Sequence, residues 1–159
     1  MIPLARPDIG FAEVEEDLRQ VLASGRLTAG PFVSRFEEML GACLGGRQVV
    51  ATSSATSALH LSLVAAGIGP GDEVLVSDFT FPASGNAIVQ AGAVPVLVDC
   101  LPGRFDLDPA DARRRITPRS RALMVVDPFG QPAEQGALSV LAEEHGLVLI
   151  EDAACALAA

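Results

Sequence analysis

The sequence predicts an α/β fold with a mainly parallel sheet covered by helices on both faces. Two observations predict it. Short apolar segments rich in valine alternate along the chain with helical patterns of about ten residues. Each apolar segment is flanked by turn residues and is short enough to be a single buried strand. This alternation is typical of βαβ units in a three-layer α/β/α arrangement.

A helical arm is expected over residues 1–45, ahead of an α/β domain over residues 46–159. Apolar side chains recur at helical spacing in two runs, which the turn at Ser24-Gly25 separates. The runs are Val14, Leu18, Val21 and Leu22, and then Phe32, Phe36 and Leu40.

The later part of the chain predicts five strands and four helices. The turn Gly69–Asp72 leads into the second strand, and Gly146 closes the last helix at its C′ position. The expected strands are Val49–Thr52, Glu73–Val76, Pro95–Val98, Ala122–Val126 and Leu147–Ile150. The expected helices are Thr56–Ala66, Ala83–Ala91, Pro109–Ile116 and Ala133–His145.

Length and charge limit the classes of function. The 159 residues, half of them hydrophobic, suffice for the core of one α/β domain but are few for a two-domain enzyme. The formal net charge is −9 and no dense basic tract exists, so nucleic acid is not an expected partner. The apolar stretches are far shorter than a membrane span, and the N-terminus does not read as a secretory leader. We therefore expect a cytoplasmic protein without a membrane partner.

The cysteines and basic residues limit the chemistry that the chain can perform. Cys43, Cys100 and Cys155 are widely spaced and have no nearby histidines, so neither a zinc site nor a disulfide framework is predicted. Apart from two histidines, the basic side chains are all arginine. Without a lysine, no side chain of this chain can form a Schiff base with a cofactor.

In an open parallel sheet, functional groups gather beyond the carboxyl ends of the strands, where loops run into helices. The segment Thr52–Ser57 is one such place, because it is rich in small hydroxyl residues and precedes a predicted helix. Its backbone N–H groups and the helix dipole suit a phosphate. An ordinary serine or threonine N-cap explains the same residues, and both interpretations stay open.

Three further loops follow predicted strands. Asp78–Pro82 contains two of the seven phenylalanines, and a ring there either stacks on a flat ligand or covers the core beneath the loop. Asp127–Pro132 is a tight loop and is explained as a simple connection. Glu151 and Asp152 follow four apolar residues, where an acid binds a metal, a ribose or a protonated ring nitrogen, or else lies at a solvated strand end.

Taken in order, these segments resemble the DegT/DnrJ/EryC1/StrS family of pyridoxal-phosphate (PLP) aminotransferases, which aminate keto sugars attached to nucleotides. The joint order and spacing of several motifs carry this resemblance, which runs along almost the whole chain. The motifs are Ile2–Pro7, Ser24–Pro31 with Phe36-Glu37, Ala58–Leu61, Gly69–Val74, Thr80–Ala87, Gly92–Val96, Gly130–Pro132 and Glu151–Ala154.

The resemblance implies a fold-type I large domain, incomplete at its C-terminus, and assigns five cofactor-binding residues. Ala55 and Thr56 match a Gly-Thr pair that holds the PLP phosphate, with alanine in place of glycine. Phe81 matches the residue that stacks on the pyridine ring, and Asp152 matches the aspartate that keeps the ring nitrogen protonated. Cys155 stands where the family has a glutamine near the cofactor's hydroxyl group.

Two positions depart further from the family. Asp127 stands where relatives commonly have histidine. The lysine that would attach the cofactor and move protons lies in the family some tens of residues beyond the aspartate, and this chain contains none.

The resulting hypothesis is the N-terminal portion of a PLP-dependent sugar aminotransferase, inactive alone. In the full enzyme the expected partners are a nucleotide-sugar substrate, an amino-acid donor and a second identical subunit. Two alternatives are a non-catalytic remnant that binds PLP or a partner, and a fragment of a related PLP-dependent sugar dehydratase. An unrelated nucleotide-binding domain would require a glycine-rich turn, which residues 53–56 do not supply.

Overall fold

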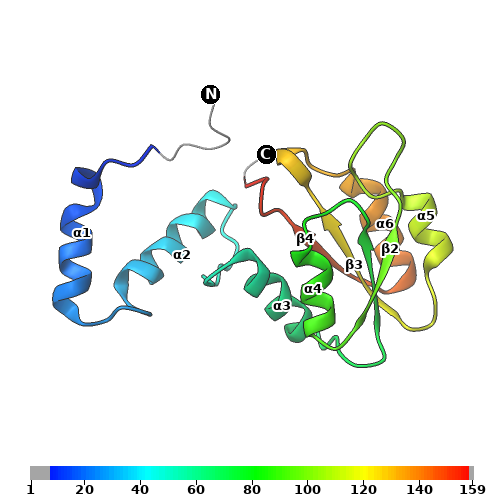
Figure 1. Ribbon diagram of the computed structural model, residues 1–159, viewed down its shortest axis with the longest axis horizontal. Coiled ribbons are helices and arrows are strands. Elements are labelled where there is room, and N and C mark those ends of the chain that lie inside the picture. The colour runs from blue at the N-terminus through cyan, green and yellow to red at the C-terminus, as the bar shows by residue number, and fades with distance from the viewer. Residues whose placement is uncertain (1–7, 158–159) are drawn as a thin grey trace. The chain divides into compact units, whose positions relative to one another are not determined.

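The computed structural model describes residues 8–157 of the chain (Figure 1). The predicted motif at residues 2–7 lies outside these described residues. The chain forms two compact units, one that ends at Ala51 and one that begins at Thr52. The proposed division into an arm over residues 1–45 and a domain over residues 46–159 stays a prediction.

The first unit contains two helices, as the apolar spacing predicts. Helix α1 spans Phe11–Ser24 and helix α2 spans Pro31–Cys43. Proline at the first position of α2 suits a helix start, because its ring fixes a helical φ and its missing N–H would have no intrahelical partner there.

Residues 49–52 were expected to form a strand, and this expectation is wrong for the structure. They have no regular secondary structure, and Val50 is 81% exposed. The backbone N–H of Ala51 donates to Glu37 Oε1 at 2.8 Å. A strand needs a neighbouring strand for its backbone hydrogen bonds, and among the described residues no strand pairs with residues 49–52.

The second unit is an α/β fold with a parallel four-stranded sheet, which confirms the predicted fold class. The strands are β1 (Glu73–Ser77), β2 (Val94–Val98), β3 (Ser120–Val126) and β4 (Val148–Asp152). Their order in the sheet is β2-β1-β3-β4, and every neighbouring pair is parallel.

Four helices accompany the strands in the predicted order. They are α3 (Ala55–Ala65), α4 (Ala83–Gln90), α5 (Pro109–Arg115) and α6 (Gln135–His145). Gly146 ends α6 in the left-handed conformation with φ of 63°, which a glycine adopts without steric cost. A single 3₁₀ turn, η1 (Pro128–Gly130), follows β3.

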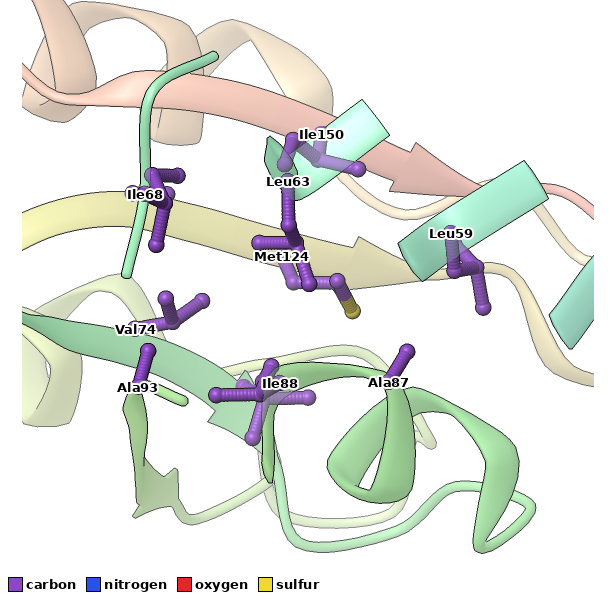
Figure 2. Close-up of a cluster of buried hydrophobic side chains, with 11 residues drawn as sticks. Leu59, Leu63, Ile68, Val74, Ala87, Ile88, Ala93, Met124 and Ile150 are labelled. Carbon is purple, nitrogen blue, oxygen red and sulfur yellow. The ribbon is translucent and has the colours of Figure 1, made fainter. Parts of the chain in front are cut away.

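Alternate residues of the central strands enter two separate hydrophobic cores. Val74 and Met124 point to the face covered by α3 and α4, where Leu63 and Ile88 pack against them (Figure 2). Val76 belongs to the same core cluster. On the opposite face Leu75, Leu123 and Val125 pack against residues of α5 and α6, including Ala112, Leu138 and Leu141. This alternation follows from the two-residue period of a strand and gives the predicted three layers.

The sheet order places a topological switch point between β1 and β3. The chain leaves β1 toward β2 on one side, whereas β3 leads to β4 on the other side. The loops that leave the carboxyl ends of β1 and β3 therefore diverge, and ligands of open α/β sheets bind in the crevice that such loops form.

Two kinds of feature are absent from residues 8–157. No helix in this range combines the length and apolar character that a membrane crossing requires. Within the same range, no cluster of three or more His, Cys, Asp or Glu side chains has the arrangement of a metal site.

Candidate functional site

A cavity of about 530 Å³ lies beyond the carboxyl ends of β1, β3 and β4, beside the start of α3. All five predicted cofactor-binding residues line it. The lining residues are Ala55, Thr56, Leu59, Phe79, Thr80, Phe81, Ala83, Val126, Asp127, Pro128, Phe129, Asp152, Ala154 and Cys155.

The first turn of α3 brings Ala55 and Thr56 to the cavity. Ser54 is the N-cap, and its Oγ accepts a hydrogen bond from the backbone N–H of Ser57 at 3.1 Å. The N-cap interpretation of this segment is thus confirmed, and it leaves the N–H groups of Ala55 and Thr56 without intrahelical acceptors. Such a helix start favours an anion. Ala55 adopts a helical conformation, so replacing the family's glycine introduces no backbone strain there.

Phe81 lies in the loop between β1 and α4, and its side chain is 77% exposed. A ring this exposed does not cover the core, which removes that interpretation of Phe81. The ring is instead available at the cavity to a flat ligand. Phe79, the other aromatic residue of this loop, stacks on Phe105 with ring centroids 4.7 Å apart.

Asp152 ends β4 with only 8% of its surface exposed, so it is not a solvated strand end. Its Oδ2 accepts a hydrogen bond from Ser84 Oγ at 2.7 Å, and its Oδ1 accepts a longer one from the N–H of Ala154 at 3.3 Å. A carboxylate so little exposed requires hydrogen bonds or a nearby positive charge. Asp152 therefore suits a cationic N–H group in the cavity.

The neighbouring acid, Glu151, does not line the cavity, because successive strand residues point to opposite faces. It contacts Gln135, whose Nε2 donates to Glu151 Oε1, and the buried Asp127. The nearby carboxyl of Asp127, together with partial desolvation, raises the pKa of Glu151. Of the two acids singled out in the sequence, only Asp152 belongs to the site.

Asp127 has a structural role that the sequence did not suggest. Its Oδ1 accepts a hydrogen bond from the backbone N–H of Ala133 at 2.9 Å, and its own N–H donates to the carbonyl of Asp152 at 3.1 Å. The side chain thus fixes the loop that carries Pro128 and Phe129 at the cavity wall.

Cys155 is exposed in the turn after β4 and lines the cavity. Its carbonyl oxygen lies 3.2 Å from the position that a Cβ on Gly130 would take. Gly130 also has a φ of 79°, so a side chain there would be strained and crowded. Glycine at this position allows the loops after β3 and β4 to approach each other.

Sequence reasoning missed three contributors to the site. Ser84 forms a hydrogen bond with Asp152, and Thr80 forms one with Ser84. Phe129 exposes its ring at the cavity, and its backbone has a positive φ of 59°. Ser84 lies three residues after Phe81, a spacing that places both at one helix start. That spacing was a usable signal for Ser84, whereas the φ of Phe129 has no signature in its residue type.

The described lining residues include the acids Asp127 and Asp152 and no lysine, arginine or histidine. A bound phosphate would therefore interact with backbone N–H groups, hydroxyl groups and the dipole of α3. The acidic end of the cavity suits a protonated ring nitrogen. The end of the cavity at α3 therefore favours a negative group, and the end at Asp152 favours a positive one.

Residues 9–159 match the family described as the DegT/DnrJ/EryC1/StrS aminotransferase family. The chain belongs to this family. The family resemblance inferred from the motifs is therefore confirmed over almost the whole sequence.

One curated relative and two solved structures illustrate the membership. The chain is 44% identical over 132 residues to a GDP-perosamine synthase of Caulobacter vibrioides, covering 83% of this chain and 36% of the relative. A crystal structure of S. venezuelae DesV shares 40% identity at a TM-score of 0.87, covering 92% of this chain and 41% of DesV. The structure of NtdA from Bacillus subtilis, solved with bound cofactor PMP, shares 36% identity at a TM-score of 0.86, covering 89% and 33%.

The chain is much shorter than these proteins. It spans 39%, 40% and 36% of the lengths of three curated relatives. Structural likeness to aminotransferases of this family confirms the fold-type I large-domain architecture, with a part of that domain present.

Proposed function

We propose that this chain forms the cofactor-holding part of a PLP-dependent aminotransferase that acts on nucleotide-linked keto sugars. The observation that carries the proposal is the cavity beyond β1, β3 and β4, where residues from four separate segments meet. The name of the GDP-perosamine synthase relative supports a nucleotide-linked sugar as the substrate class. The PMP bound to NtdA supports a pyridoxal-type cofactor.

The residues present fit such a cofactor. When bound, PLP supplies an aldehyde that takes up the amino group and a ring that accepts electron density. Asp152 would hold a proton at the ring nitrogen, because a nearby carboxylate favours the charged form of that nitrogen. Phe81 would lie against the flat face of the ring, and the N–H groups and hydroxyl at Ala55 and Thr56 would bind the phosphate.

Cys155 and Asp127 complete the cavity wall in this proposal. Cys155 occupies the turn beside Asp152, so it would lie near the cofactor's hydroxyl group. Asp127 would act through the loop, since its carboxylate is engaged by the N–H of Ala133.

The chain by itself is expected to be inactive. It contains no lysine, and within the described lining the titratable side chains are Asp127, Asp152 and Cys155. None of them is an amine that attaches the cofactor and then moves a proton between substrate carbon atoms. The full enzyme would also require the amino-acid donor. Family membership supports a second identical subunit and a cytoplasmic location as further parts of the proposal.

Titration of the 159-residue chain with PMP tests the cofactor site. PMP is the suitable probe because it has no aldehyde that could react with the N-terminal amine. We expect binding by calorimetry, and we expect Asp152→Asn to weaken it at least about tenfold, the loss typical of a charged hydrogen bond.

The matched control is Glu151→Gln, which changes the adjacent acid outside the cavity and should leave the affinity within about twofold. Absence of PMP binding, or equal effects of the two variants, contradicts the proposed site.

A non-catalytic module that binds PLP or a partner is the second candidate, and the absence of lysine favours it. Amino transfer to a nucleotide-linked keto sugar by purified chain, PLP and amino-acid donor would contradict inactivity. The DNA after the codon for Ala159 separates the candidates. A continuing frame that encodes a lysine in a serine-rich loop favours the aminotransferase, and its absence favours the module.

A further inference from the structure

We propose that Ser84 is a positioning residue that fixes the Asp152 carboxylate for the cofactor. The inference rests on the proposed function, because it concerns the residue that would bind the ring nitrogen. Nothing in the family motif, as matched above, gives Ser84 a role.

Ser84 is fully buried as the second residue of α4, and its hydroxyl takes part in two short hydrogen bonds. Ser84 Oγ lies 2.7 Å from Asp152 Oδ2 and 2.7 Å from Thr80 Oγ1. A hydroxyl has a single proton to donate, and an ionised carboxylate accepts only. Ser84 therefore donates to Asp152, and Thr80 donates to Ser84, which gives a directed chain from Thr80 to Asp152.

This hydrogen bond occupies one carboxylate oxygen and leaves the other available. Oδ1 has only the longer contact of 3.3 Å with the N–H of Ala154, whereas Oδ2 is bonded by Ser84 at 2.7 Å. The short O–H···O distance is that of a charge-assisted bond, which fixes the orientation of the group. Oδ1 is then the oxygen that can accept from a ring N–H in the cavity.

Ser84 also links two functional groups that are distant in sequence. It lies three residues after Phe81, and the N–H of Ser84 donates to the carbonyl of Phe81 at 3.2 Å. The same turn that carries the exposed ring thus holds the carboxylate of β4, 68 residues later. The ring and the carboxylate are positioned relative to each other by this one side chain. The start of α4 adds a favourable dipole for the negative charge.

Removal of the hydroxyl would leave a largely buried carboxylate with one weak donor, which permits rotation or water entry. We therefore expect Ser84→Ala to weaken PMP binding by about ten- to a hundredfold, as for loss of a hydrogen bond to a charged group. Ser84→Thr keeps the donor and should restore the affinity to within about threefold of the unchanged chain. Ser62→Ala, an exposed serine of α3, is the matched control.

A double-mutant cycle separates positioning from general damage to the fold. If Ser84 acts through Asp152, Ser84→Ala should change PMP affinity by less than about threefold when Asp152→Asn is already present. An undiminished effect of Ser84→Ala in that background overturns the inference, and so does an unchanged affinity in the Ser84→Ala variant.

A second readout needs no cofactor. The carboxyl ¹³C NMR signal of Asp152 in the 159-residue chain at pH 7 should move with Ser84→Ala, return with Ser84→Thr and stay in place with Ser62→Ala. A signal that does not respond overturns the inference even if PMP binds. If the signal responds but the chain binds no PMP, the hydrogen bond between Ser84 and Asp152 exists but does not serve a cofactor. That result contradicts the proposed function rather than the hydrogen bond.

Discussion

Asp127 and Glu151 lie at the neighbouring ends of β3 and β4, and the nearby Asp127 carboxyl raises the pKa of Glu151. Partial desolvation acts in the same direction, while the hydrogen bond from Gln135 acts against it. A bond between two carboxyl groups needs one proton between them. When both are ionised, the contact becomes a repulsion between like charges.

Asp127→Asn is expected to stabilise the chain at pH 7. Asparagine still accepts from the N–H of Ala133, and its amide donates to Glu151 in place of the repulsion. Because Glu151 is exposed, the gain is that of a surface charge pair, from a few tenths to about 1 kcal/mol. Chemical denaturation with urea at several pH values measures it.

The sign of the pH dependence follows from the raised pKa. A carboxyl whose pKa is higher in the folded chain contributes stability below its ordinary pKa, and this contribution is lost as the pH rises through the raised value. The advantage of Asp127→Asn over the unchanged chain should therefore grow between about pH 4 and pH 7. Asp127→Ala, which lacks the acceptor for Ala133, should be less stable than either. An advantage that shrinks with rising pH contradicts the explanation.

Asp111 has the opposite effect on the pH dependence of stability. The N–H of Asp99 and the guanidinium groups of Arg115 and Arg114 lower its pKa to about 2. A lowered pKa contributes stability above the ordinary value of the carboxyl, and this contribution is lost as the pH falls through about 2. The free energy of unfolding should therefore decline between about pH 4 and pH 2.

Asp111→Asn should make this acid decline shallower, as followed by the midpoint of thermal unfolding at each pH. Glu143→Gln, at an exposed site of α6, is the control and should leave the slope as it is. An unchanged slope in Asp111→Asn would show that other carboxyl groups cause the decline.

These side-chain pairs show where sequence reasoning stopped. Asp152, Phe81 and Thr56 could be predicted because a parallel sheet gathers strand ends at one edge, and a family motif then assigns their roles. The bond between Ser84 and Asp152 joins residues 68 positions apart. Its existence depends on the direction of one rotamer at the start of α4, which no residue pattern specifies.

Helices and strands could be predicted where local sequence determines them. Each of β1 to β4 was expected within a few residues of its position, since each contains a short apolar run, although only the central strands β1 and β3 are buried along most of their length. Residues 49–52 have that composition too, yet Val50 is exposed and no strand pairs with it among the described residues. Composition permits a strand, but a neighbouring strand is needed to form one.

The core between the sheet, α3 and α4 predicts a large difference between two leucines of the same helix. Leu63 is fully buried against Val74 and Met124 (Figure 2), whereas Leu61 is 53% exposed. Leu63→Ala should lower the free energy of unfolding by about 2–5 kcal/mol, because it removes buried apolar contacts and leaves a cavity. Leu61→Ala should change it by about 0.5 kcal/mol or less, as for exposed sites. Urea unfolding of both variants checks the difference, and equal losses would contradict this core.

At Phe129 we expect a glycine substitution to be more stable than an alanine substitution, the reverse of the usual order in a helix. It is the one non-glycine residue among those described that has a positive φ, at 59°, and its ring is 76% exposed. Phe129→Ala and Phe129→Gly both remove the ring, which packs on Phe105 with centroids 5.4 Å apart. Only alanine retains the left-handed strain of about 1–2 kcal/mol.

Glycine has a larger entropy cost on folding, about 0.5–1 kcal/mol relative to alanine, which offsets part of that difference. Phe129→Gly should therefore unfold at a higher urea concentration than Phe129→Ala, by a margin of about 0.5–1 kcal/mol. At the exposed helical site Ala137, where φ is negative, Ala137→Gly should instead destabilise the chain by a similar amount. Opposite signs at the two sites would show that the wall of the cavity is held in a strained conformation, and equal signs would show that it relaxes in solution.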